Sequence, residues 1–119
     1  MSYKISKVED HKNTRGWLCG QFFPDEDLFK TDQLEVKFST MLPGETAPKH
    51  FHPIGDELLI ILDGKMTVTF DGNTHLLTKN DYVFIQAGSV ESIDEVIEPV
   101  KFIAIRTPSV PNNKTIVDE

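Results

Sequence analysis

Two histidines and a glutamate in one short stretch are the residues of this sequence best suited to bind a metal ion. His50 and His52 lie two positions apart, within KHFHPIGDE. Successive side chains of a β-strand point to opposite faces, so this spacing places both imidazoles on one face. Glu57 follows five positions after His52, which would put it on the other face of a continuous strand. Residues 53–56 are turn-forming and can reset that parity, so we expect the three side chains to converge.

Neutral imidazoles and a carboxylate suit several divalent transition metal ions, including iron, manganese, nickel, cobalt and zinc. Three protein ligands leave coordination positions open for water or for a substrate. The spacing therefore predicts a mononuclear metal site, with Fe, Mn, Zn and Ni left open as the metal.

The same stretch resembles the first conserved motif of the cupins, G(x)5HxH(x)3-4E(x)6G. The residues at its fixed positions are Gly44, His50, His52, Glu57 and Gly64. The resemblance implies an all-β chain with the cupin-type double-stranded β-helix, a jelly-roll barrel whose cavity holds the metal ligands.

The second cupin motif, G(x)5PxG(x)2H(x)3N, is only partly present, at residues 80–95. Asn80 stands in place of the first glycine, Gly88 matches, and Gln86, Glu91 and Glu95 replace the proline, histidine and asparagine. Asparagine tolerates a positive φ better than other non-glycine residues, so we expect the first turn to persist. The resemblance covers about residues 34–107.

Glu91 occupies the position from which the motif's histidine would supply a third imidazole. We therefore predict four metal ligands: His50, His52, Glu57 and Glu91. A second carboxylate lowers the charge of the centre by one unit and hardens it, which favours Fe, Mn or Zn. In the alternative, Glu91 points to solvent and the other three residues form the site.

Short strands separated by turns are the elements that must position these ligands. Residues 34–41 and 65–70 alternate between apolar and polar side chains, which predicts half-buried strands. Asp63-Gly64 is a hairpin signal, and a second turn is expected at residues 71–73. Further short strands are expected at residues 75–78, 82–86, 90–97 and 100–107. Because helical periodicity is absent, the pattern predicts an all-β sandwich or barrel.

At 119 residues, the chain has the length of one domain. We expect a single domain over residues 1–119, with its barrel core at about 34–107. Residues 1–33 are expected to form N-terminal strands or an arm, and residues 108–119 a loosely packed or extended tail. Trp17, Phe22 and Phe23 are predicted core or interface residues.

Composition argues against several classes of protein. Nineteen acidic and twelve basic side chains give a formal charge of −7, which disfavours nucleic acids and anionic membranes as partners. The longest apolar run, residues 58–62, is far short of the roughly 20 residues that cross a bilayer. The N-terminus lacks the apolar segment of a signal peptide, so a cytoplasmic location is expected.

Other reactive side chains are less well placed in the sequence to bind a metal or to catalyse a reaction. His11 lies among charged residues and is expected in a solvated loop, and His75 falls where the cupin pattern supplies no ligand. Cys19 has no partner for a disulfide and is interpreted as a small core residue. Tyr82 and Arg106 are candidates for additional polar groups of the cavity. Their alternatives are an ordinary strand aromatic and a solvent-facing arginine.

Leu58, Ile60 and Leu62 alternate with Glu57, Leu59 and Ile61, so this strand is apolar on both faces. Something must cover its outer face. A second subunit related by a two-fold axis is the commonest solution, so we expect a homodimer.

The resemblance allows dioxygenases, sugar isomerases and epimerases, decarboxylases, lyases, and non-enzymatic sensors or storage-like proteins, and the fold does not choose among them. Our leading hypothesis is a mononuclear metal cupin that acts on a small polar molecule, by isomerase or lyase chemistry or by dioxygenation. The alternative is a non-catalytic small-molecule binding or sensor cupin. A third reading is a structural dimerisation domain with a vestigial site, so enzymatic activity stays open.

Overall fold

The computed structural model describes residues 2–117, without the side chains of residues 12 and 13. A short 3-10 helix, η1 (Val8–Thr14), stands where we expected a strand or an arm. The strands that follow are β1 (Trp17–Cys19), β2 (Glu35–Met41), β3 (Ala47–Phe51), β4 (Asp56–Phe70), β5 (Asn73–Thr78), β6 (Tyr82–Ile85), β7 (Glu91–Thr107) and β8 (Thr115–Ile116). Among the described residues, no helix is long and apolar enough to cross a membrane.

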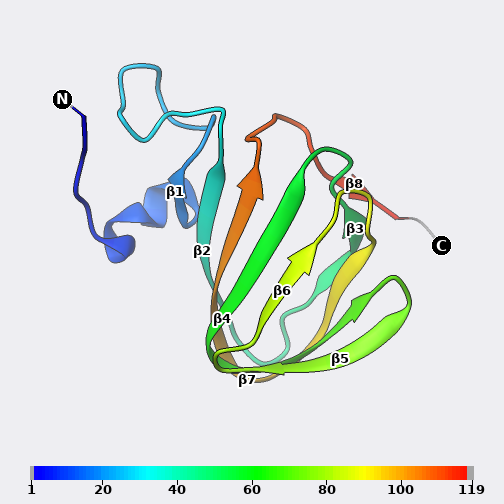
Figure 1. Ribbon diagram of the computed structural model, residues 1–119. Coiled ribbons are helices and arrows are strands. Elements are labelled where there is room, and N and C mark those ends of the chain that lie inside the picture. The colour runs from blue at the N-terminus through cyan, green and yellow to red at the C-terminus, as the bar shows by residue number, and fades with distance from the viewer. Residues whose placement is uncertain (1, 118–119) are drawn as a thin grey trace.

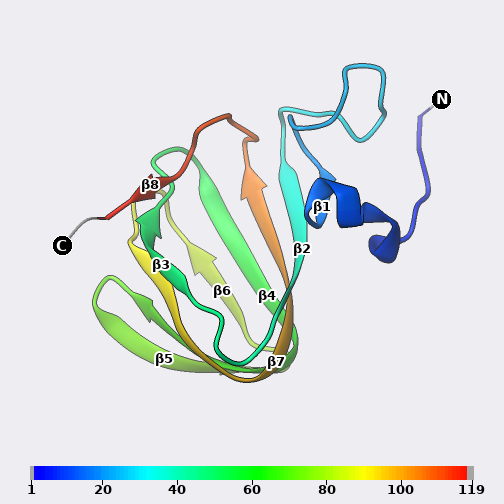
Figure 2. The same cartoon turned by 180° about the vertical axis from the view of Figure 1, so that it is seen from behind.

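The strands form one antiparallel sheet that rolls up on itself (Figure 1). Its path runs β1-β2-β7-β3-β8, and β4 also pairs with β5, β6 and β7. The two long strands β4 and β7 pair along their whole lengths, from Asp56 opposite Thr107 to Phe70 opposite Glu91. Viewed from behind, η1 lies beside β1 and β2, outside the rolled sheet (Figure 2). The prediction of an all-β chain is confirmed.

The hairpin predicted at Asp63-Gly64 is wrong, because β4 continues through these residues as a bulged strand. Gly64 has a φ of +93°, and a Cβ there would lie 2.1 Å from the carbonyl oxygen of Pro99. The glycine therefore serves a close approach between β4 and β7. Likewise, β7 is one bulged strand where the sequence predicted two. The turn expected at residues 71–73 is confirmed and joins β4 to β5.

The hydrophobic core lies inside the roll. In β4 the expected alternation is confirmed, with Leu59 and Ile61 buried while Leu58 and Ile60 are half-buried. The largest fully buried side chains are Ile61, Met66, Val68 and Val100. Of the predicted aromatic core residues, Phe23 is buried, Trp17 is half-buried, and Phe22 is exposed and stacked on Trp17.

The polar face of β2 turns inward. Glu35 and Lys37 lie opposite Arg106 and Ala104 of β7, and residues directly opposite in an antiparallel pair share a face. Ala104 belongs to the core and Glu35 is buried, so this face looks into the roll. Charged residues on the inner face of a strand are unusual, which marks this wall as a candidate functional surface.

Candidate metal centre

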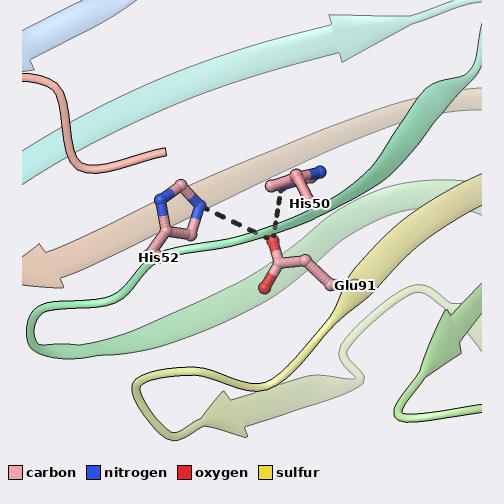
Figure 3. Close-up of side chains that lie close together, drawn as sticks. All are labelled: His50, His52 and Glu91. Atoms are coloured by element: carbon pink, nitrogen blue, oxygen red, sulfur yellow. Dashed lines mark ion pairs between the residues drawn. The ribbon is translucent and has the colours of Figure 1, made fainter. Parts of the chain in front are cut away.

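His50 lies at the end of β3 and His52 directly follows it, and both side chains are buried. Their rings point toward the carboxylate of Glu91, at the start of β7 (Figure 3). The turn expected between His52 and Glu57 is present and includes Gly55, which has a φ of +80°. A Cβ at Gly55 would lie 2.0 Å from the carbonyl oxygen of Thr107. This turn starts β4 with Glu57 buried.

Backbone carbonyls orient both imidazoles. Nδ1 of His50 lies 2.7 Å from the carbonyl oxygen of Pro48, and Nδ1 of His52 lies 2.5 Å from that of Asn113. A carbonyl oxygen only accepts hydrogen bonds, so each Nδ1 must donate. In the neutral ring, Nε2 then carries the lone pair. Histidine ligands of metal ions are commonly oriented in this way, with the other ring nitrogen donating a hydrogen bond.

Glu91 meets both of these lone pairs. Its Oε1 atom lies 3.2 Å from Nε2 of His50 and 3.9 Å from Nε2 of His52. Ligand atoms of the three residues all lie within 4.8 Å of one another, so they could hold a metal ion. Nε2 of His52 and Oε2 of Glu91 are buried and have no hydrogen-bond partner within the described chain. Unpartnered nitrogen and oxygen atoms converging on one point fit a transition metal.

Glu57 lies beside this group but is turned toward Arg106. Its Oε2 atom lies 2.9 Å from Nε of Arg106, while its Oε1 atom is buried without a hydrogen-bond partner in the described structure. Arg106 also donates a 2.9 Å hydrogen bond from Nη1 to Glu35, whose other oxygen accepts one from Ser109. The structure thus brings His50, His52 and Glu91 together and keeps Glu57 paired with an arginine.

Burial and neighbouring charges set the protonation of the centre. Burial is the main cause that raises the pKa of Glu57 to about 8, against the attraction of Arg106, and the neighbouring Glu91 carboxylate adds to the rise. Burial also opposes ionisation of Glu91, but its close neighbours His50 and Glu57 lower its pKa. Burial and Arg106 lower the pKa of His52. A neutral His52 and an ionised Glu91 are the forms that bind a metal.

His50 and Glu91 lie in the wall of a cavity of about 900 Å³, whereas His52 lines a small neighbouring pocket. His50, Glu57, Glu91 and Arg106 line this cavity, so Arg106 is not solvent-facing. Tyr82 does not fulfil the role considered for it, because it lies on the outer face of β6 with 71% of its surface exposed.

Two expectations about flanking segments are corrected. His11 is not in a solvated loop, because it is half-buried in η1, packs against the rings of Phe23 and Phe29, and lines the same cavity. The C-terminal tail is not loosely packed throughout. Ser109 is buried, and the Asn113 carbonyl orients His52. His75, for which no ligand role was predicted, is exposed on β5.

Sequence reasoning did not find Glu35, Lys37, Ser109 or Asn113 as parts of this region. The alternation of residues 34–41 grouped Glu35 with Lys37 on one face, but periodicity alone does not tell which face is inside. Ser109 and Asn113 follow proline-rich sequence and carry no periodic signal. Their roles come from long-range contacts.

Comparisons with known proteins agree with this architecture. Residues 37–105 match the family described as Cupin domain. Quercetin 2,3-dioxygenase of Bacillus subtilis is 36% identical over 61 residues, which cover 51% of this chain and 18% of that enzyme. The match thus spans less than a fifth of that relative's length.

Solved structures show the same fold. A Klebsiella pneumoniae protein with a double-stranded β-helix domain has a TM-score of 0.70 at 17% identity, covering 98% of this chain and 99% of that one. DMSP lyase DddQ of Ruegeria pomeroyi has a TM-score of 0.66 at 21% identity, covering 74% of this chain and 45% of that one. The predicted double-stranded β-helix is therefore confirmed. With more than half of its residues matched by the family and this fold, the chain belongs to the cupin superfamily.

Proposed function

We propose that this protein is an enzyme that binds one divalent transition metal ion and acts on a small polar molecule in its central cavity. His50, His52 and Glu91 would hold the ion, with Glu57 as the fourth ligand. The observation that carries the proposal is the meeting of two imidazole lone pairs and a carboxylate within 4.8 Å, beside a cavity that His50 and Glu91 line. The metal would be Fe, Mn, Zn or Ni.

The residues around the centre have separate tasks in this proposal. When bound, the metal supplies Lewis-acid chemistry to the substrate. Pro48 and Asn113 hold the two imidazoles through their carbonyls, and Arg106 holds Glu57 beside the centre. Leu59, Val68 and Phe102 give the cavity an apolar lining that limits the water around a bound molecule.

The reaction type is isomerase or lyase chemistry, or dioxygenation. The likeness to quercetin 2,3-dioxygenase supports dioxygenation, since its 36% identity extends over half of this chain. The likeness to a DMSP lyase, at 21% identity, supports the fold alone. The reaction and the substrate of this chain are therefore parts of the proposal.

Metal analysis tests the proposed centre. Protein made without an affinity tag or a nickel column should contain about one transition metal ion per chain. His50→Ala and His52→Ala should lose it, and His75→Ala is the matched control because His75 lies exposed on β5. A wild-type protein that stays empty when offered excess Fe, Mn, Zn and Ni would refute the proposal. Metal uptake with small-molecule binding, but without turnover of any candidate substrate, would favour the sensor alternative.

We also propose the homodimer, with support from one face of the sheet. On the outer side of β2, β7, β4 and β6, the strand registers align two rows of four apolar residues each. Their members are Val36, Ile105, Leu58 and Phe84 in one row, and Phe38, Ile103, Ile60 and Tyr82 in the other. Phe84 and Tyr82 expose 61% and 71% of their surface, and a second copy would cover them. The single-domain boundaries and the cytoplasmic location stay predictions.

A further inference from the structure

Several basic side chains line the cavity that contains the proposed metal centre. Beside Arg106, they are Arg15, Lys37, Lys101 and Lys114, and the electrostatic neighbours of Lys37 among them are Arg106, Lys114 and Arg15. The chain as a whole has more acidic than basic residues and a formal charge of −7. Lys37 is half-buried, whereas Arg15 and Lys114 line the cavity as exposed residues. Cations gathered along one cavity of such a protein run against its overall charge, so they call for a local reason.

Carboxylates of the protein do not neutralise this cluster. Arg106 pairs with Glu35 and Glu57, whereas no ion pair or hydrogen bond from the side chains of Arg15, Lys37 or Lys114 occurs within residues 2–117. The carboxylates that line the cavity are Glu9, Glu57 and Glu91. Of these, Glu91 lies at the proposed metal centre, and Glu57 is paired with Arg106 beside it.

Glu9 also leaves the three cations unmatched. It is an exposed residue of η1 and forms no ion pair with any described residue. The side chains of Arg15, Lys37 and Lys114 therefore line the cavity without an ion-pair partner in the part of the chain that the structure describes.

The environment of Lys37 disfavours its positive charge. Its side chain extends from the inner face of β2, and its Nζ atom lies 5.4 Å from the centre of the Trp17 ring. Burial lowers the pKa of Lys37, and repulsion from Arg106, Lys114 and Arg15 lowers it further. An anion placed among these groups would offset both effects.

Arg15 is fixed against the same strand. It adopts a φ of +55°, which non-glycine residues rarely do. A Cβ on the next residue, Gly16, would lie 2.1 Å from the carbonyl oxygen of Phe38, and Phe38 donates a 2.9 Å hydrogen bond to Gly16. The turn therefore lies directly on β2, and Arg15 is held near Lys37 by backbone contacts.

We propose that Arg15, Lys37 and Lys114 form a subsite for an anionic group of the substrate, a carboxylate or a phosphate. This inference rests on the proposed function, because it places the substrate's reacting part at the metal centre of the same cavity. The substrate class is then a small acidic molecule that carries at least one carboxylate or phosphate. Arginine and lysine together suit such an oxyanion, since they supply charge-assisted hydrogen bonds.

Calorimetric titration tests the subsite with three probes at constant ionic strength: succinate, inorganic phosphate and the uncharged succinamide. Wild-type protein should bind succinate or phosphate saturably, and the tighter of the two identifies the group. Lys37→Met and Lys114→Met should each weaken that binding by about tenfold, the usual effect of losing one charge-assisted hydrogen bond. Fluorescence of Trp17, the only tryptophan, should change with the same dissociation constant.

Matched variants separate this site from general charge effects. Lys79→Met changes an exposed lysine of the turn after β5 and should bind the probe as the wild type does. Equal binding of succinamide, or wild-type affinity in both Lys37→Met and Lys114→Met, would overturn the proposal. Lys114 is exposed, so Lys114→Met should fold even if Lys37→Met does not.

The His52→Ala variant distinguishes failure of the subsite from failure of the metal centre. The three cations do not require a metal, so His52→Ala should keep the succinate or phosphate affinity of the wild type. If the wild type proves free of metal but still binds the probe through Lys37 and Lys114, only the proposed enzymatic function fails. If the probe affinity disappears in His52→Ala, the anion binds the metal instead and the subsite is refuted.

Discussion

Nε2 of His50 lies 3.2 Å from Oε1 of Glu91, although each atom is an acceptor in its ordinary state. The Pro48 carbonyl holds the ring proton on Nδ1, so it leaves Nε2 of the neutral ring with only a lone pair. Two buried acceptors at this distance repel each other unless a proton or a metal ion lies between them. The contact between His50 and Glu91 therefore requires a proton or a metal ion between the two atoms, and the proposed centre would supply the metal ion.

The first prediction concerns Glu91→Gln. The amide keeps the shape of the side chain and removes its charge, so the affinity for the metal should fall by at least about tenfold. That is the lower end of the loss seen when even outer partners of a metal site are removed. Competition with a chelator of known affinity measures it. Glu95→Gln, also on β7 but exposed, is the control. Unchanged metal stoichiometry and affinity in Glu91→Gln would mean that Glu91 is not a ligand.

The second prediction concerns Gly64, a fixed position of the first cupin motif. Gly64→Ala should lower the free energy of unfolding by at least about 3 kcal/mol, because a positive φ is combined with a Cβ only 2.1 Å from the Pro99 carbonyl. Gly72→Ala has a similar φ of +83° but meets nothing within 4 Å, so about 1 kcal/mol is expected. Urea unfolding followed by circular dichroism compares the two. Equal losses of unfolding free energy in the two variants would show that β4 and β7 can move apart at little cost to make room for the Cβ atom.

The stretch from His50 to Glu57 was predictable because its signals are local. Strand periodicity places two residues at spacing two on one face, and Gly55 supplies the turn that restores the parity of Glu57. Asn80 was also predictable, and it adopts a φ of +73°. In these cases the chemistry of a few neighbouring residues decides the backbone.

Other features depend on partners that are distant in the sequence. A hairpin and a bulge use the same residues, so Asp63-Gly64 could be assigned only once β7 was known to pair across it. The inward direction of Lys37 depends on which face of β2 meets Ala104. The Asn113 carbonyl reaches His52 across 61 positions. Local patterns do not contain this information.

The third prediction uses Cys19, which the sequence suggested to be a core residue without a catalytic role. Burial raises the pKa of the Cys19 thiol, and the Glu35 carboxylate adds to the rise. Less thiolate is present at a given pH, so iodoacetamide should react more slowly at pH 8.5 with folded than with urea-unfolded protein. The difference should shrink as the pH increases. A folded-state rate equal to or above the unfolded rate would reveal an activated thiol.

The last prediction concerns the homodimer. Phe84 lies opposite Leu58, and Tyr82 opposite Ile60, so the two exposed aromatic residues continue the apolar outer face of β4. Light scattering at micromolar concentration should give twice the 13.5 kDa mass of one chain. Phe84→Lys should give the monomer, because a lysine buried in the apolar interface would lose its hydration without gaining a counter-charge. Leu76→Lys is the matched control, since Leu76 is exposed to a similar degree on β5 but lies outside the two rows. A wild-type monomer would contradict the dimer. If Leu76→Lys dissociates the dimer while Phe84→Lys does not, the interface includes β5 and not the two rows of apolar residues.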